Sequence, residues 1–139
     1  MYSRLKERFD IPYSSILKRN IISKNYQLLT GHIPSFDDQI VKAYKRKDMV
    51  SVNHRVTEYI AAYFDLVFAA NEVLHPGEKR MITIAIDRCK NLPDDIEDIS
   101  NLLNNLSNED KAMYYLNQLT ENITNFISKY KLLPWVNTE

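Results

Sequence analysis

The chain has 139 residues, of which 45% are hydrophobic and 26% are charged, and 18 Lys and Arg residues balance 18 Asp and Glu residues. This length and composition predict one globular domain over residues 1–139 and exclude a disordered or fibrous chain. A formal net charge of zero predicts no general attraction to nucleic acid or to an anionic membrane. The single cysteine, Cys89, excludes an internal disulfide, and no targeting or membrane-spanning stretch is recognisable, so we expect a cytoplasmic protein without membrane or nucleic-acid partners.

The first half of the chain shows helical spacing, in which apolar residues recur at intervals of three and four. One such stripe predicts a helix that ends near Gly31, and its members are Ile16, Leu17, Ile21, Leu28 and Leu29. A short helix is expected after Ser35, whose hydroxyl can cap the first turn. A long helix is expected from Met49 to Leu74. Because Tyr59 to Ala70 is apolar on nearly every side, this helix should be central and surrounded by others.

The second half continues the same pattern after each proline. Pro76 suits the first position of a helix that runs to about Lys90, and Pro93 precedes a further short helix. Ser107 is the expected cap of the final helix. That helix has apolar residues at alternating steps of four and three, namely Ala112, Leu116, Leu119, Ile123, Phe126 and Tyr130. The sequence therefore predicts an all-α fold, an up-and-down helical bundle of four main helices with short additional helices.

Two groups of acidic residues could be considered cation sites by their composition. Glu58, Asp65 and Glu72 recur every seven residues on the long helix, but residues seven apart lie about 10 Å from one another along a helix, too far to share one ion. We expect them to form a solvated or helix-bridging stripe, with Arg55 as the partner of Glu58. The second group follows Pro93, where carboxylates would stabilise a helix N-terminus, and consists of Asp94, Asp95, Glu97 and Asp98.

Known catalytic motifs are missing. The chain has no glycine-rich phosphate loop, no HExxH or CxxC pair and no GxSxG elbow, and its three histidines are far apart. We therefore expect no metal site and no catalytic residue in this chain.

The stretch His75 to Arg80, with the sequence HPGEKR, is the one segment that routine helical packing does not explain. A helix starting at Pro76 would place free backbone N–H groups beside Lys79 and Arg80, which suits a phosphate or a carboxylate. The alternative is a helix–helix corner in which Glu78 completes a cap and both cations are solvated. Spacing alone favours the corner.

The segment YFDLVFAANEVLHPGEKRM, Tyr63 to Met81, resembles a helical domain of unknown function. That domain follows the nucleotidyltransferase domain in a group of bacterial proteins distantly similar to aminoglycoside nucleotidyltransferases. An aromatic-Asp run, an Asn and a His/Tyr-Pro-Gly-Glu-Lys corner carry the resemblance. The rest of the chain adds only a compatible helical pattern.

The resemblance implies a function that this chain would perform only with a partner. Such enzymes carry a Gly-Ser and an Asp-x-Asp on a separate α/β domain, where the carboxylates hold Mg²⁺ against the nucleotide phosphates, and this chain has neither motif. Mg²⁺ and a nucleotide are thus expected only with such a catalytic domain. By analogy, five residues are candidates for substrate or interdomain contact, with Glu78 the only plausible general base among them: Asn71, His75, Glu78, Lys79 and Arg80.

Two functions therefore remain open. The chain is either a helical substrate-recognition or interaction module of a nucleotidyltransferase-like protein, inactive alone, or a stand-alone helical protein–protein interaction domain. The second function would use the basic stretch Lys42 to Lys47 or a homodimer surface.

Overall fold

The computed structural model describes residues 14–30 and 35–136 of the chain, and the secondary structure of these residues is helical without any strand. Their elements are α2 (Ser15–Thr30), α3 (Phe36–Lys45), α4 (Met49–Ala70), α5 (Met81–Arg88), α6 (Asp98–Asn104) and α7 (Glu109–Lys129). The predicted all-α class is confirmed. The finer arrangement, an up-and-down bundle of four main helices, stays a prediction. None of the described helices is long and apolar enough to cross a membrane.

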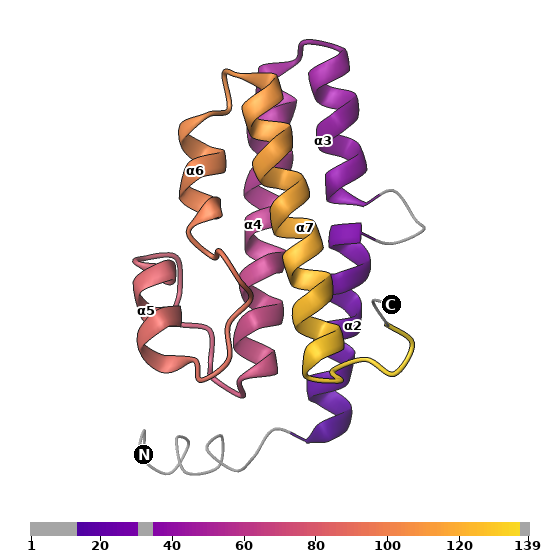
Figure 1. Cartoon of the computed structure of the whole chain (residues 1–139), viewed down its shortest axis with the longest axis vertical. Helices are drawn as coiled ribbons and strands as arrows, with labels where there is room; N and C mark the ends of the chain where they lie inside the picture. Colours follow the sequence, from indigo (N-terminus) through magenta and orange to yellow (C-terminus); the bar gives the residue numbers. More distant parts are fainter. Residues whose placement is uncertain (1–13, 31–34, 137–139) are drawn as a thin grey trace.

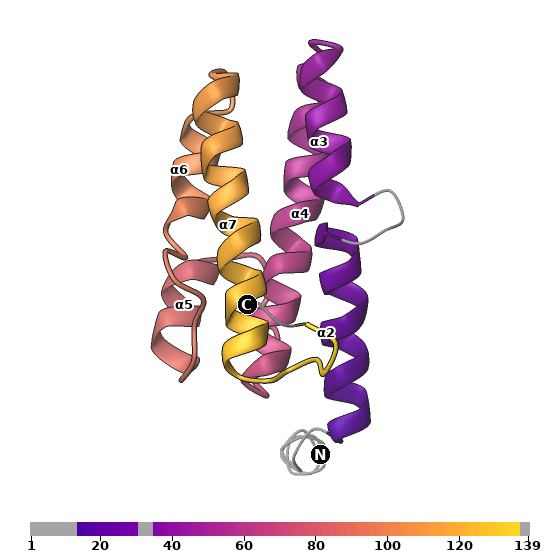
Figure 2. The ribbon, with the colours of Figure 1, turned by 45° about the vertical axis from the view of Figure 1, so that its right-hand side comes forward.

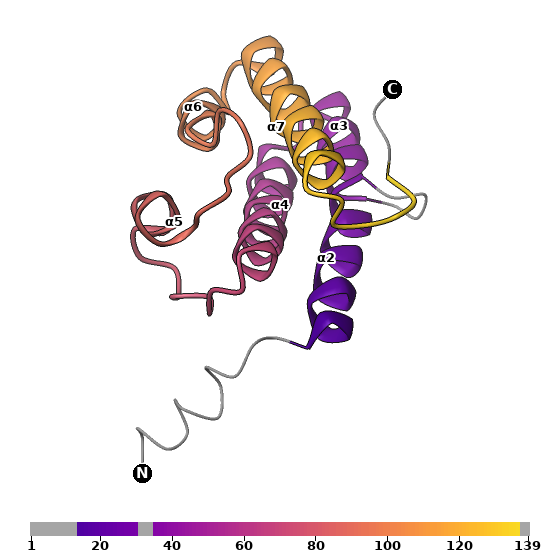
Figure 3. The same ribbon diagram turned by 60° about the horizontal axis from the view of Figure 1, so that its bottom comes forward.

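Helix α4 lies at the centre of the molecule. Helices α2 and α3 pack on one side of it, one below the other, and α5 and α6 lie on the other side (Figures 1 and 2). Helix α7 runs alongside α4 and also packs on α6 and α3 (Figure 1). Seen from below, α4 separates α2 from α5 (Figure 3). The two sides of α4 therefore face different parts of the fold.

The aromatic segment of α4 forms the core, as the sequence predicts. Eleven of the 22 residues of α4 are buried. Tyr63 and Phe64 pack edge to face with ring centroids 5.6 Å apart, and Phe64 stacks with Phe68 at 6.1 Å. The Tyr59 hydroxyl lies 2.8 Å from Thr120 Oγ1, which ties α4 to α7. These aromatic side chains are core residues and not an exposed stacking surface.

The side-chain caps predicted at Ser35 and at Ser107 are both wrong. Ser35 begins α3 as the N-cap residue, although its hydroxyl donates to the Asp37 carboxylate and caps no backbone N–H. The sequence predicts Ser107 as the cap of α7, but Asn108 is the cap, with its Oδ1 accepting from Lys111 N at 3.1 Å. Asn108 immediately precedes the first helical residue, and its extended backbone lets the side chain reach back over the first turn. The predicted stop at Gly31 lies outside the described residues.

Helix α4 ends at Ala70, four residues before the predicted end at Leu74. Glu72 adopts a left-handed backbone with φ of 55°, and Val73 N donates to Phe68 O at 2.9 Å while Glu72 N donates to Ala69 O at 3.0 Å. This pair of bonds is the Schellman closure of a helix, formed here without glycine. Glu72 therefore does not share a helical stripe with Glu58 and Asp65, and that prediction is wrong.

Two helices begin later than predicted. α5 begins at Met81 and not at Pro76, because Gly77 with φ of 97° and Arg80 with φ of 55° are left-handed and cannot continue a right-handed helix. Similarly, α6 begins at Asp98, since Asp95 has φ of 55°. Of the acidic group after Pro93, only Asp98 lies in a first helical turn.

Candidate functional site

The corner, defined as residues 71–80 between α4 and α5, is anchored by Asn71. The Asn71 Nδ2 donates to Val67 O at 2.9 Å and to Asn91 O at 2.7 Å, while its Oδ1 accepts from Asn91 N at 2.8 Å. The side chain thus caps α4 and also pairs with the backbone just after α5. Both of its donor hydrogens are used, so Asn71 holds the corner in place and has no donor left for a ligand.

His75 folds back from the corner onto α4. Its ring packs edge to face on Phe68 with centroids 5.3 Å apart, and its Nδ1 accepts from Gly77 N at 3.0 Å. A neutral imidazole that accepts at Nδ1 carries its proton on Nε2, which lies 3.6 Å from Asp65 Oδ1. Both ring nitrogens therefore face protein groups, which suits a positioning side chain and not a free general base.

The corner does not offer the helix N-terminus that the anion hypothesis required. Lys79 and Arg80 precede α5, and Arg80 is its N-cap residue with no side-chain hydrogen bond to the first turn. Glu78 lies before the helix and so cannot be its third residue. The structure therefore has neither a helix N-terminus at Pro76 that could bind an anion nor a helix cap formed by Glu78.

The five predicted contact residues separate onto two faces of α4. His75 lines a cleft of about 290 Å³ between α2 and α4, here called the α2–α4 cleft. Glu78 and Arg80 line a groove of about 590 Å³ between α4, α5 and α6, here called the α5 groove. Lys79 lines neither of them, and Asn71 is held in the corner. One contiguous sequence motif thus contributes to two distinct surfaces.

The α5 groove has an apolar floor and a charged rim. Its rim carries Glu78, Arg80 and Glu97. Its floor consists of Ile60, Phe64, Met81, Ile82, Ile99 and Leu103. Apolar lining with a few charged groups at the edge is typical of a surface that binds and orients a partner.

The α2–α4 cleft has residues that the sequence did not single out. Its floor is formed by Ile21, Phe68, Ala69 and Val73, and its polar walls by Lys24 and Asn25 of α2 opposite Asp65 and His75. Asn25 is only 7% exposed, and its Nδ2 donates to Ile21 O at 2.9 Å. Lys24 and Asp65 are 41 residues apart in the sequence, and only the packing of α2 against α4 brings them to one cleft.

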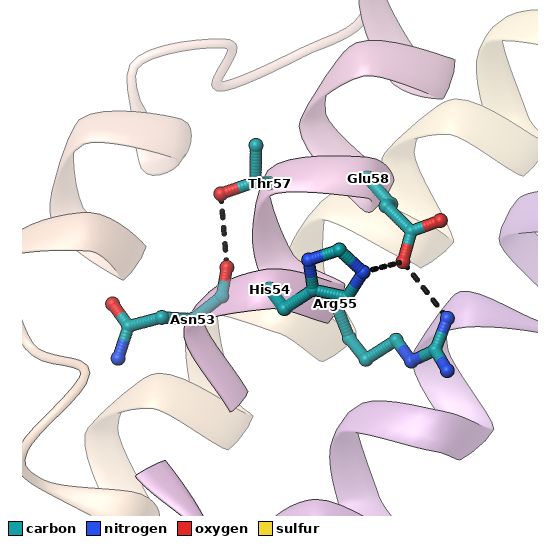
Figure 4. A network of polar contacts seen from close by, with 5 residues as sticks. All are labelled: Asn53, His54, Arg55, Thr57 and Glu58. Atoms are coloured by element: carbon teal, nitrogen blue, oxygen red, sulfur yellow. Dashed lines mark hydrogen bonds and ion pairs between the residues drawn. The ribbon is translucent and has the colours of Figure 1, made fainter. Parts of the chain in front are cut away.

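The N-terminal half of α4 carries an exposed polar network (Figure 4). Glu58 Oε1 accepts from Arg55 Nη1 at 2.8 Å, as predicted, and lies 3.2 Å from His54 Nε2. Thr57 Oγ1 donates to Asn53 O at 2.9 Å within the same turn. These are helix-surface pairs at spacings of three and four, and they explain the local charges without a ligand.

Two further polar features lie away from the corner. The basic stretch Lys42 to Lys47 lies at the opposite end of α4 from the corner, where Arg46 pairs with Asp48 at 3.8 Å (Figure 1). Tyr63 is fully buried, and its hydroxyl has no hydrogen-bond partner within the described part of the chain. Burial raises the pKa of Tyr63 above its ordinary value, and nearby Tyr59 adds to this. Among residues 14–30 and 35–136, no group of three or more His, Cys, Asp and Glu side chains is placed to hold a metal ion.

Comparisons with protein-family models, with curated proteins and with solved structures gave no match to this chain. The resemblance of Tyr63 to Met81 to a nucleotidyltransferase-associated domain therefore stays a prediction.

Proposed function

We propose that this chain is a helical recognition module of a nucleotidyltransferase-like protein, and that it contacts an α/β catalytic domain through the α5 groove. The observation that carries the proposal is that Glu78 and Arg80, two of the five residues implicated by the resemblance, form the rim of an apolar groove. The module positions substrate or partner, and the metal-binding carboxylates belong to the other domain.

The exposure of apolar residues along the α5 groove supports a docking surface. Of the eight residues of α5, only Ala85 is buried, and Leu103 on the facing helix α6 is 47% exposed. Covering this apolar surface would release water from it, which favours association. The rim adds one cation and two carboxylates, so the matching surface should carry both signs of charge around an apolar anchor.

The corner is rigid enough to fix the direction of these charges. Asn71 makes three hydrogen bonds, and His75 Nδ1 accepts one from Gly77 N. A corner whose backbone is held before binding loses less conformational entropy when a partner arrives. Glu78 and Arg80 extend from this ordered corner, and so they are the charges best placed to set specificity.

The catalytic part of the proposal is tested with the chain alone. We expect no nucleotidyl transfer from ATP or GTP with Mg²⁺, because the sequence lacks the Gly-Ser and the Asp-x-Asp that hold metal and nucleotide. Release of pyrophosphate and labelling of an acceptor are the measurements. Turnover above a no-protein control, abolished by replacing any acid of this chain, would show that the chain is itself an enzyme.

The contact through the α5 groove is tested by replacing two neighbouring cations, Arg80, which lines the groove, and Lys79, which does not. A nucleotidyltransferase domain encoded in the same or an adjacent reading frame is expressed separately, and its association with this chain is followed by calorimetry. We expect Arg80→Gln to weaken association about threefold or more, and less at high salt, whereas Lys79→Gln leaves it unchanged because Lys79 does not line the groove. Neither change should alter the free energy of unfolding by more than about 0.5 kcal/mol.

The opposite results favour the stand-alone function. If Arg80→Gln and Lys79→Gln bind the catalytic domain with equal affinity, the α5 groove does not form the contact. If neither reading frame encodes such a domain, and the chain sediments as a dimer that Leu103→Asp dissociates, the α5 groove is a homodimer surface and the nucleotidyltransferase relation is wrong.

A further inference from the structure

The α2–α4 cleft holds opposite charges on facing walls that do not pair with each other. Lys24 extends from α2, and Asp65 lies on α4 across the cleft. Within the described part of the chain, no salt bridge joins Lys24 to a carboxylate, and Asp65 pairs only with His75, at 3.6 Å. The side chain of Asp65 remains 48% exposed. Each wall therefore presents a charge that a ligand can reach.

The floor between these charges is apolar. Phe68 and Ala69 are 1% and 3% exposed, and the partly buried Ile21 and Val73 complete the floor. His75 closes one end, where its contacts with Phe68 and Gly77 fix the ring. A ligand that reaches both charged walls would therefore place an apolar group over the accessible parts of Ile21 and Val73.

The volume limits the size of that ligand. The cleft measures about 290 Å³, at the lower end of the roughly 300–1,000 Å³ typical of small-molecule pockets. A nucleotide is large and mostly polar, whereas a molecule of amino-acid size matches both the volume and the apolar floor.

We propose that the α2–α4 cleft binds a small zwitterion with an apolar side chain, an amino acid of the size of leucine. Its ammonium group pairs with Asp65, its carboxylate pairs with Lys24, and its side chain covers Ile21 and Val73. Charge-assisted hydrogen bonds of this kind fix orientation, and the apolar contact supplies affinity. This site is on the other face of α4 from the α5 groove and does not rest on the proposed function.

The probe is free leucine, added at pH 7 to the ¹⁵N-labelled chain and followed by amide chemical shifts. We expect saturable shifts in the millimolar range of leucine, largest at Val73 and His75 beside the cleft. Two smaller molecules separate the contributions: 4-methylpentanoate keeps the carboxylate and the apolar group, and 3-methylbutylamine keeps the ammonium and the apolar group. Each should bind at least about threefold more weakly than leucine, because each loses one charged contact.

Two variants test whether Asp65 binds the ammonium group of leucine and Lys24 binds its carboxylate. Asp65→Asn should weaken leucine at least about threefold and leave 4-methylpentanoate unchanged, whereas Lys24→Gln should weaken leucine and leave 3-methylbutylamine unchanged. Lys111→Gln and Asp87→Asn are matched controls, since both residues are exposed and line neither the cleft nor the groove. All four positions are exposed, so the variants should fold, which circular dichroism checks.

Several results would overturn the proposal. Linear, unsaturated shifts, or shifts spread over the surface, show that leucine does not bind in the cleft. Equal affinity for leucine and either single-charge molecule shows that the opposed charges do not select a zwitterion. Unchanged leucine binding by both Asp65→Asn and Lys24→Gln places the ligand elsewhere.

Discussion

Helices α4 and α5 are consecutive and both rich in apolar residues, yet the fold uses them in opposite ways. Eleven residues of α4 are buried, whereas Ala85 is the one buried residue of α5. α4 is covered by α2 and α3 on one side, with α7 alongside, while α5 lies at the edge of the molecule (Figure 3). A groove remains between α5, α4 and α6. The difference shows that apolar composition predicts helix formation, but that the connection between two helices decides how much of each is covered.

Hydrogen exchange should show the largest difference between the two helices. Amides in Tyr59 to Phe68 should exchange only through global unfolding, which costs about 5–15 kcal/mol in domains of this kind. Amides of α5 should open locally, at a free energy lower by at least about 2 kcal/mol, because only one of its eight residues is buried. Equal protection of both helices would contradict the comparison.

A pair of truncations should separate the helices by stability. Leu66 in α4 is fully buried, so Leu66→Ala should lower the free energy of unfolding by about 2–5 kcal/mol through lost burial and a residual cavity. Ile86 in α5 is 51% exposed, and Ile86→Ala should cost no more than about 0.5 kcal/mol. Urea denaturation measures both values. Similar losses would mean that α5 is as well packed as α4.

The connection itself depends on Asn71. Asn71→Ala removes three hydrogen bonds and leaves the Asn91 N–H and C=O without that partner, so we expect a loss of about 1–3 kcal/mol in stability. Asn53→Ala is the matched control, since this exposed amide donates only to Met49 O one turn earlier in α4. If Asn53→Ala lowers the stability as much as Asn71→Ala does, the hydrogen bonds between Asn71 and Asn91 do not contribute to stability.

A smaller effect than that of Asn71→Ala is expected at Gly77. Its φ of 97° disfavours any side chain, although an added Cβ would meet no atom within 4 Å. Gly77→Ala should therefore cost about 1 kcal/mol through backbone strain alone. Gly77→Asn should cost less, because Asn tolerates left-handed backbone better than Ala does. A gain in stability for Gly77→Ala would show that this residue is not left-handed.

Part of the candidate site was predictable from the sequence. The motif from His75 to Arg80 stood out because it interrupts helical spacing, and the structure places a non-helical corner there. The sequence did not indicate that His75 faces one side of α4 while Glu78 and Arg80 face the other. Lys24 was missed altogether, since nothing near it in the sequence marks it as a neighbour of Asp65.

The sequence by itself determined the helical class, the central position of α4 and the apolar stripe of α7. These features follow from apolar residues at spacings of three and four, which act within single helices. Tertiary structure alone decided where α4 ends, where α5 begins and which charges share a cleft. Glu72 and Arg80 take left-handed backbones that glycine would normally signal, and Asn71 binds a residue twenty positions away. Such outcomes depend on how whole helices pack, so local spacing cannot encode them.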